Sequence, residues 1–228
     1  MTEKIIDYVD FTELQMFLNS LPTPDWDAPE RQYHYPVSAS KYDKCPQLKQ
    51  RPFSNAFKMV RGSKYHEYYI PHIIEFMGLE NGEYEYLHKI NLSCNSCDSG
   101  SFPFGGSIDY YNKGKEWLID FKFSESSYST DSYIPQLSAY AYFSEFGMKK
   151  VEGKWTMAMG PVRSISILKI HPVTFECSEN VITTPLTKDE IFTKAKNLHD
   201  YKKHGKDNYA PGINCRWCTD KNCKLKMK

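Results

Sequence analysis

The sequence lacks long apolar runs, an excess of one charge, and repeats. No stretch approaches the roughly 20 apolar residues that a membrane-spanning helix requires, and no apolar signal core follows residues 1–4. The 29 Lys and Arg residues nearly balance the 28 Asp and Glu residues, which leaves a net charge of +1. We therefore expect a soluble, intracellular (cytoplasmic) protein with no membrane partner, in which any nucleic-acid site is local. The absence of internal repeats and low-complexity tracts excludes a repeat architecture.

The chain is long enough to bury a substantial core. It has 228 residues, of which 40% are hydrophobic, and we expect a single main domain. Its seven cysteines are odd in number and include two Cys-x-x-Cys pairs. A chain of this size needs no disulfides for stability, so the cysteine pattern favours metal ligation over an oxidised framework.

Helical and strand-like segments alternate along the chain. Apolar spacing predicts helices at residues 5–18, 54–77, 131–146 and from the Thr187-x-x-Glu190 capping box to about residue 204, with a short helix starting at Ser40. Proline at position 71 predicts a kink in the second of these. Segments rich in β-branched and aromatic residues predict strands at 83–92, 105–111, 117–123 and 164–171.

Two of these strands should form a hairpin that carries an acidic face. Alternation along residues 117–123 directs Trp117, Ile119, Phe121 and Phe123 into a core, while Asp120 and Lys122 point the other way. A turn of two or four residues near Gly114 places Asp109 on the same face as Asp120. Adjacent carboxylates repel unless a cation neutralises them, and hard oxygen ligands suit Mg²⁺ or Mn²⁺. The alternative is an amphipathic strand whose polar face is simply solvated.

At these residues the sequence resembles a nuclease family. Asp109, followed by Asp120-Phe121-Lys122, resembles the core signature of the PD-(D/E)XK nuclease superfamily. The segment 62–66, which ends in His66, resembles the helical histidine motif of its RecB-like branch, and Gln136 with Tyr140 resembles the Gln-x-x-x-Tyr motif of that branch. Gln136 and Tyr140 are spaced i and i+4, so they share one face of their helix.

The resemblance implies a fold and a mechanism. The fold is an α/β restriction-endonuclease-like core, in which a central mixed sheet flanked by helices carries the acidic hairpin. His66, Asp109, Asp120 and the Phe121 carbonyl would hold Mg²⁺ or Mn²⁺ against the scissile phosphate. Lys122 would orient or activate the attacking water and stabilise negative charge, and Gln136 and Tyr140 would position the strand or the nucleophile.

The cysteines near the C-terminus form a compact module. Cys215, Cys218 and Cys223 lie within nine residues, a spacing in which three thiolates can converge on one metal centre. Cys45-Pro46 resembles the upstream cysteine of iron–sulfur RecB-like nucleases, including the CRISPR-associated exonuclease family. This resemblance implies a [4Fe–4S] cluster on Cys45 and the three C-terminal cysteines.

Zinc is the main alternative to the cluster. Cys94 and Cys97 form a second Cys-x-x-Cys pair, and together with Cys215 and Cys218 they would complete a structural Zn²⁺ site. A third possibility leaves Cys94 and Cys97 as free thiols at a hairpin tip. Cys177 is expected to be structural.

The resemblance covers residues from about 38 to 223. We therefore expect an N-terminal helix and linker at 1–36 and a nuclease domain at 37–228, with the cysteine-rich metal-cluster module at 210–228. The implied function is a metal-dependent DNA exonuclease acting on free, single-stranded ends, in DNA repair, recombination, phage DNA metabolism or CRISPR adaptation. The alternative is a non-catalytic, metal-stabilised DNA-end-binding subunit of a nuclease or CRISPR-adaptation assembly.

Overall fold

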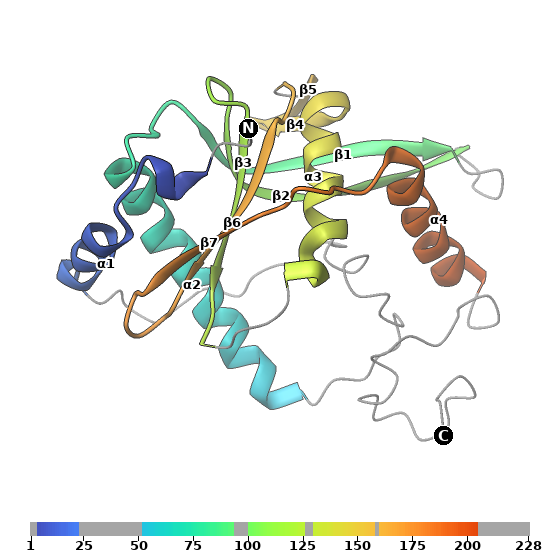
Figure 1. Ribbon diagram of the computed structural model, residues 1–228. Coiled ribbons are helices and arrows are strands. Elements are labelled where there is room, and N and C mark those ends of the chain that lie inside the picture. The colour runs from blue at the N-terminus through green and yellow to red at the C-terminus, as the bar shows by residue number, and fades with distance from the viewer. Residues whose placement is uncertain (1–3, 23–51, 94–99, 126–129, 158–159, 205–228) are drawn as a thin grey trace.

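The computed structural model describes residues 4–22, 52–93, 100–125, 130–157 and 160–204 (Figure 1). It is an α/β structure, in which a central mixed sheet is flanked by helices, and the expected fold class is confirmed at this level. The cysteine module at 210–228, the boundary at residue 36 and the short helix expected at Ser40 lie outside the described residues. None of the described helices combines the length and the apolar character needed to cross a bilayer.

The described sheet has the strand order β5-β4-β1-β2-β3-β6-β7. Its strands are β1 (Glu83–Ser93), β2 (Ser101–Asn112), β3 (Trp117–Phe123), β4 (Met148–Val151), β5 (Lys154–Met157), β6 (Ser164–Ile170) and β7 (Cys177–Val181). The helices are α1 (Phe11–Ser20), α2 (Pro52–Phe76), α3 (Ile134–Phe146) and α4 (Lys188–His204), with 3-10 turns at Ile5–Asp7 and Thr130–Tyr133. β3 and β6 are parallel, and the other neighbouring strands are antiparallel.

Two hydrophobic cores lie on opposite faces of this sheet. The α3-side core includes Leu118 and Leu137, and the α2-side core includes Ile70, Ile119 and Phe121. Neighbouring residues of β3 therefore pack into different cores, as alternation requires. Because helices cover both faces, most of β3 is buried.

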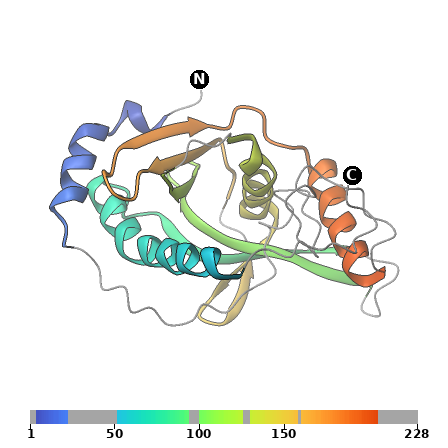
Figure 2. The same ribbon diagram turned by 90° about the horizontal axis from the view of Figure 1, so that it is seen from below.

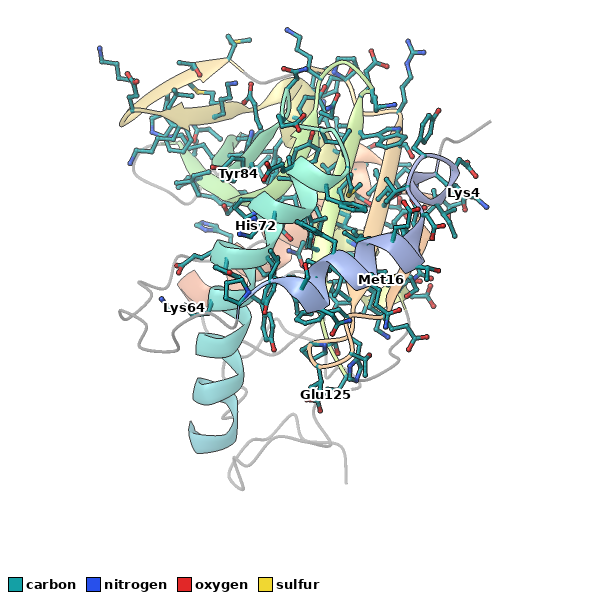
Figure 3. The ribbon with its side chains drawn as sticks, turned by 90° about the vertical axis from the view of Figure 1, so that its left-hand side faces the viewer. Lys4, Met16, Lys64, His72, Tyr84 and Glu125 are labelled. Carbon is teal, nitrogen blue, oxygen red and sulfur yellow. The ribbon has the colours of Figure 1, made fainter. Side chains whose placement is uncertain are left out.

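The N-terminal residues belong to the α2-side core. Leu14 and Leu18 of α1 are fully buried in it, and Phe17 stacks on Phe76 of α2 with ring centroids 5.0 Å apart. Figure 3 shows α1 lying across α2, with Met16 labelled on its exposed side. The helix begins later than the expected residue 5, because the Asp10 carboxylate accepts the Thr12 N–H at 2.7 Å and caps a helix that starts at Phe11.

The hairpin between β2 and β3 closes as predicted. Asn112 pairs with Trp117 across a four-residue turn, and the Asn112 Oδ1 accepts the Lys115 N–H at 2.9 Å. The Asn112 Nδ2 donates to the Tyr110 hydroxyl at 2.9 Å, and that hydroxyl donates to the Leu79 carbonyl at 2.6 Å. This buried network fixes the register of the hairpin, and with it the relative position of the two acidic residues.

The sequence predicted some of the strands and a helix cap correctly and did not predict the other strands. The strand expected at 117–123 matches β3, and those expected at 83–92 and 164–171 match β1 and β6 within one residue at either end. β2 begins four residues before the expected start, and β4, β5 and β7 were missed. The β4–β5 hairpin turns at Glu152 and Gly153, which both have positive φ, as a two-residue hairpin turn requires; Gly153 was the local sequence signal for it. The Thr187 capping box is confirmed: the Glu190 carboxylate accepts the Thr187 N–H at 2.8 Å.

Gly105 is required where β2 lies against β1. A Cβ at this position would stand 2.2 Å from the His88 carbonyl oxygen and 2.9 Å from the Lys89 Cβ. Both obstacles belong to the paired strand, which cannot move without loss of the β1–β2 ladder. A side chain at this position is therefore incompatible with the observed pairing.

We expect Gly105→Ala to lower the free energy of unfolding by about 2–3 kcal/mol, since overpacking against a fixed strand is costly. Gly114→Ala is the matched control, because its Cβ would meet the Asn112 Oδ1 at an ordinary 3.5 Å. This control should change stability by no more than about 0.5 kcal/mol. Urea denaturation of both variants gives the comparison, and equal effects would contradict the steric account.

Candidate active site

β2 and β3 separate just beyond their hairpin. They pair only from Asn112↔Trp117 to Tyr110↔Ile119. From there β2 continues beside β1, whereas β3 continues beside β6 (Figure 1). We call the region where these strands diverge the fork. Asp109 and Asp120 are the first residues beyond the last pair, so both carboxylates lie where the fork opens.

The two faces of β2 also exchange sides at this point. Ile108 and Tyr110 are two residues apart and should share a face, yet Ile108 packs in the α3-side core and Tyr110 in the α2-side core. Asp109 lies between them. Its side chain can consequently approach groups that come from both sides of the sheet.

The Asp109 carboxylate takes the place of a backbone ladder partner. Its Oδ2 accepts the Phe121 N–H at 3.0 Å, so an amide of β3 that has lost its strand neighbour stays satisfied. The same oxygen lies 3.7 Å from the Lys122 Nζ, and the other oxygen lies 3.8 Å from the His66 Nδ1. Asp109 thus joins β2 to both β3 and α2.

Asp120 is almost completely buried, with 1% of its surface exposed. Its Oδ2 lies 2.5 Å from the Lys122 Nζ, but within the described structure neither carboxylate oxygen accepts a hydrogen bond of normal geometry. Burial raises the pKa of Asp120 to about 6; the Lys122 ammonium opposes this shift and the Asp109 carboxylate adds to it. The sequence predicted the face of Asp120 correctly, but the alternative of a solvated polar face is wrong because α3 covers it.

Lys122 is the resident cation of the fork. Its Nζ contacts both carboxylates and donates to the Phe121 carbonyl at 3.2 Å. Burial lowers its pKa, but Asp120 and Asp109 outweigh burial and the net shift is upward. Lys122 therefore remains an ammonium group at neutral pH. It can donate hydrogen bonds and stabilise negative charge, but it is poorly suited to act as a base.

His66 is held beside the fork by its neighbour on α2. Tyr65 stacks on Phe123 with centroids 4.9 Å apart, and its hydroxyl donates to the Pro172 carbonyl at 2.6 Å. The His66 ring meets the edge of Phe123 at 5.9 Å, which leaves its Nδ1 near Asp109. Tyr65 is thus a structural residue that anchors the helix.

Gln136 and Tyr140 approach the fork from α3. The Gln136 Nε2 donates to the Tyr140 hydroxyl oxygen at 3.1 Å, which confirms the expected i, i+4 relation. Both side chains are buried. Burial and the nearby Asp109 carboxylate raise the pKa of Tyr140, so it remains a neutral phenol. Because its oxygen accepts from Gln136, its O–H can donate to another group.

The structure therefore brings together six predicted side chains from α2, β2, β3 and α3: His66, Asp109, Asp120, Lys122, Gln136 and Tyr140. The Phe121 carbonyl also faces them. Sequence reasoning missed Tyr133, whose ring lies 5.5 Å from the Lys122 Nζ; its signal was an aromatic residue just before the helix that carries Gln136. Six of the seven cysteines lie outside the described residues: Cys45, Cys94, Cys97, Cys215, Cys218 and Cys223.

Cys177 is the one cysteine within the described residues. It begins β7, and its thiol donates to the Phe175 carbonyl at 3.2 Å. Burial raises the pKa of this thiol to about 12, so it is unreactive at neutral pH. This agrees with the structural role expected for it.

The donor atoms of the fork suit a hard divalent cation, although they are not arranged as a finished site. Within the described residues no three His, Cys, Asp or Glu side chains converge closely enough to form a metal cluster. However, Asp120 has two buried oxygens that lack hydrogen bonds, with the Asp109 carboxylate beside it. Oxygen donors of this kind are those that Mg²⁺ and Mn²⁺ prefer. The chemistry of the residues fits such an ion, which would compete with the Lys122 ammonium.

Comparisons with known proteins give a fold likeness. No protein-family model matches the sequence, and no curated protein matches it. Among solved structures, one described as "Crystal structure of SSO0001" superposes with a TM-score of 0.55 at 15% sequence identity. The match covers 99% of each chain. At this identity the likeness shows a shared fold over nearly the whole length, and nothing more.

We expect the metal-free protein to lose stability as the pH rises from about 4 to about 6. The folded-state pKa of Asp120, about 6, lies above the ordinary value of 3.8 for an aspartate side chain, so the folded state binds more protons in this window. The stability that Asp120 contributes through this protonation is fully present below about pH 4 and is lost as the pH passes 6. The loss in the free energy of unfolding is at most about 3 kcal/mol, at about 1.4 kcal/mol per pKa unit.

Chemical denaturation between pH 4 and 7, with metal chelated, measures this effect. Asp120→Asn, which keeps the shape and cannot titrate, should lack this part of the pH dependence. Parallel curves for wild type and variant would show that Asp120 has no raised pKa.

Proposed function

We propose that the protein is a divalent-metal-dependent nuclease that hydrolyses DNA phosphodiester bonds from free, single-stranded ends. The observation that supports this most strongly is the convergence of the acidic hairpin, the α2 histidine and the α3 Gln-x-x-x-Tyr pair in one fork. These residues lie far apart in sequence, and the resemblance to RecB-like PD-(D/E)XK nucleases implied that they would share a site. The likeness in fold is compatible with this proposal but does not carry it.

In the proposed site, Asp109, Asp120, His66 and the Phe121 carbonyl would hold Mg²⁺ or Mn²⁺. When bound, such an ion polarises a phosphoryl oxygen and lowers the pKa of its water. Burial and charge together favour an added cation: burial raises the pKa of Asp120, the single Lys122 ammonium opposes this shift, and the neighbouring Asp109 carboxylate adds to it. An added cation relieves that excess of negative charge.

Lys122 would act as a fixed positive charge. Its ammonium is held by two carboxylates and the Phe121 carbonyl, so it needs little reorganisation to stabilise charge that develops on a phosphate. Its raised pKa favours this role over proton abstraction. Lys122 would also orient the attacking water by donating to it.

Tyr140 would donate a hydrogen bond to the DNA strand or to the attacking water. The Gln136 amide fixes the phenol by donating to its oxygen, and burial holds both groups in place. Gln136 is thus a positioning residue that acts through Tyr140. We propose action on free ends because this pair resembles the motif of end-processing nucleases. A partnership with repair, recombination or CRISPR-adaptation proteins likewise rests on the family resemblance.

One observation favours a second candidate function. Lys122 already lies between the two carboxylates, and the described residues contain no ready-made metal cluster. The fork could therefore be a purely structural ion-pair network in a non-catalytic DNA-end-binding subunit. Nuclease activity of the purified protein separates the two candidates.

Asp120→Asn should reduce Mg²⁺- or Mn²⁺-dependent cleavage of single-stranded DNA by at least roughly 100-fold, the scale on which even indirect metal contacts act. The amide is isosteric, so the fold should persist. Asp189→Asn, at an exposed position on α4, makes the same chemical change away from the fork and should leave cleavage intact. Undiminished cleavage by a clean Asp120→Asn preparation would exclude the fork as the active site.

End dependence gives a separate expectation. Linear single-stranded DNA should be degraded and covalently closed single-stranded circles spared, because the Gln136 and Tyr140 pair resembles that of enzymes acting on ends. Gel analysis of both substrates at equal nucleotide concentration makes the comparison. Rapid cutting of circles would indicate an endonuclease at the same site.

The cysteine proposal concerns residues outside the described structure and rests on sequence alone. We expect iron and acid-labile sulfide in anaerobically purified protein, with Cys45→Ser losing both and folding less stably, since cluster binding contributes to folding. A zinc site would give colourless protein from which Cys94→Ser, and not Cys45→Ser, releases metal. Elemental analysis of the wild type and both variants decides between the two ligand sets.

A further inference from the structure

One arm of the sheet has a face that the described helices leave open. In the arm formed by β1, β2, β4 and β5, His88 and Ile90 are buried on the side of α3. The residues that alternate with them, such as Asn91, Pro103 and Ser107, are exposed. Figure 2 shows α3 on one side of the β1–β2 arm and the β4–β5 hairpin extending toward the other side, where α2 lies.

Strand register defines the residues of this open face. Directly paired residues point to the same side of a sheet, and the pairs Asn91↔Pro103, Lys89↔Gly105, Lys89↔Met148, Met148↔Met157 and Lys150↔Trp155 connect in this way. We call this set, with the pair Leu87↔Ser107, the open face. It comprises Leu87, Lys89, Asn91, Pro103, Gly105, Ser107, Met148, Lys150, Trp155 and Met157.

The open face combines positive charge with an aromatic ring. It has two lysines and no carboxylate among its members, and the Lys89 Nζ lies 3.9 Å from the centre of the Trp155 ring. Trp155 is half-buried, whereas Lys150 is exposed and Met157 is 77% exposed. Lys149, on the other face of the hairpin, is instead neutralised by Glu83 at 2.5 Å. Of the two lysines on that other face, Lys149 and Lys154, one is thus neutralised, whereas the side that carries Trp155 has two lysines and no carboxylate among its members.

The open face leads directly to the fork. Ser107 precedes Asp109 by two residues on β2, and Lys89 pairs with Gly105, four residues before Asp109. Four strand residues correspond to roughly 13 Å. Gly105 has no side chain and Ser107 a small one, so nothing bulky on β2 separates Lys89 from Asp109.

We infer that the open face binds a single strand of nucleic acid on its way to the fork. Lys89 and Lys150 contact phosphates, and a base stacks on Trp155, which is the combination that single-strand-binding surfaces use. A single strand fits better than a duplex because a duplex keeps its base faces hidden. A second copy of this chain fits poorly, since a two-fold contact through this face would bring lysines against lysines. The inference rests on the proposed function, for which it specifies the substrate path.

Two variants of one hairpin test the inference. Lys150 lies on the open face, whereas Lys154 pairs with Val151 and points to the opposite side, so Lys150→Glu and Lys154→Glu make the same charge change on opposite faces. Anisotropy of a 5′-fluorescein-labelled single-stranded 20-mer is measured with the full-length protein in chelator, which prevents cleavage. Lys150→Glu should raise the Kd at least tenfold and Lys154→Glu less than twofold. Trp155→Ala should raise the Kd about fivefold or more.

Three results would overturn the inference: equal weakening by Lys150→Glu and Lys154→Glu, duplex DNA bound as tightly as the single strand, or a change of oligomeric mass in Lys150→Glu, which would make the face a contact between copies. Light scattering on the same samples gives the mass.

The proposed function fails differently. In that case wild-type protein would show no metal-dependent cleavage while the contrast between Lys150→Glu and Lys154→Glu in binding persists. Equal binding by the two variants with Asp120-dependent cleavage intact would refute the open face alone.

Discussion

The hydrogen bond from the Phe121 N–H to the Asp109 carboxylate is the constraint on which the rest of the site depends. Two strands that part inside a sheet leave backbone donors without partners, and a buried donor left unpaired is costly. Asp109 satisfies one such donor at the point where β2 leaves β3. The fork can then remain open, and side chains from α2 and α3 can meet where a continuous ladder would have kept them on separate faces. A structural requirement of the sheet thus fixes one carboxylate of the candidate site.

Burial then gives the fork its electrostatic character. Asp120 is held out of water with its oxygens short of hydrogen bonds, and its raised pKa reflects that cost. Lys122 compensates in part and is itself kept charged by the two carboxylates. The site therefore has two carboxylates and one ammonium group, and this charge balance favours the binding of a further cation. The same arrangement serves phosphate chemistry well, because a metal and an ammonium can share the developing negative charge.

The sequence predicted the chemistry of the fork better than its shape. Alternation along β3 and the spacing of the turn placed Asp109, Asp120 and Lys122 on one side, and helical spacing paired Gln136 with Tyr140. The sequence could not show that the two faces of β2 exchange sides at Asp109, since that depends on Ile108 and Tyr110 packing into different cores. Short edge strands such as β5 have too few residues for their periodicity to be recognised, so the sequence pattern does not predict the open face. The late start of α1 depended on a single capping residue, Asp10, inside an otherwise helical pattern.

The central claim is that the two carboxylates of the fork bind a divalent cation, for which the Lys122 ammonium competes. Calorimetric titration of Mn²⁺ into wild type and Lys122→Met tests this most directly. The substitution removes the Lys122 ammonium group and leaves both carboxylates unchanged. The account predicts that Lys122→Met binds one Mn²⁺ per fork more tightly than wild type, since two carboxylates then lack any neutralising charge. Unchanged or weaker Mn²⁺ binding in Lys122→Met would contradict the account and indicate that the carboxylates serve only to hold the lysine.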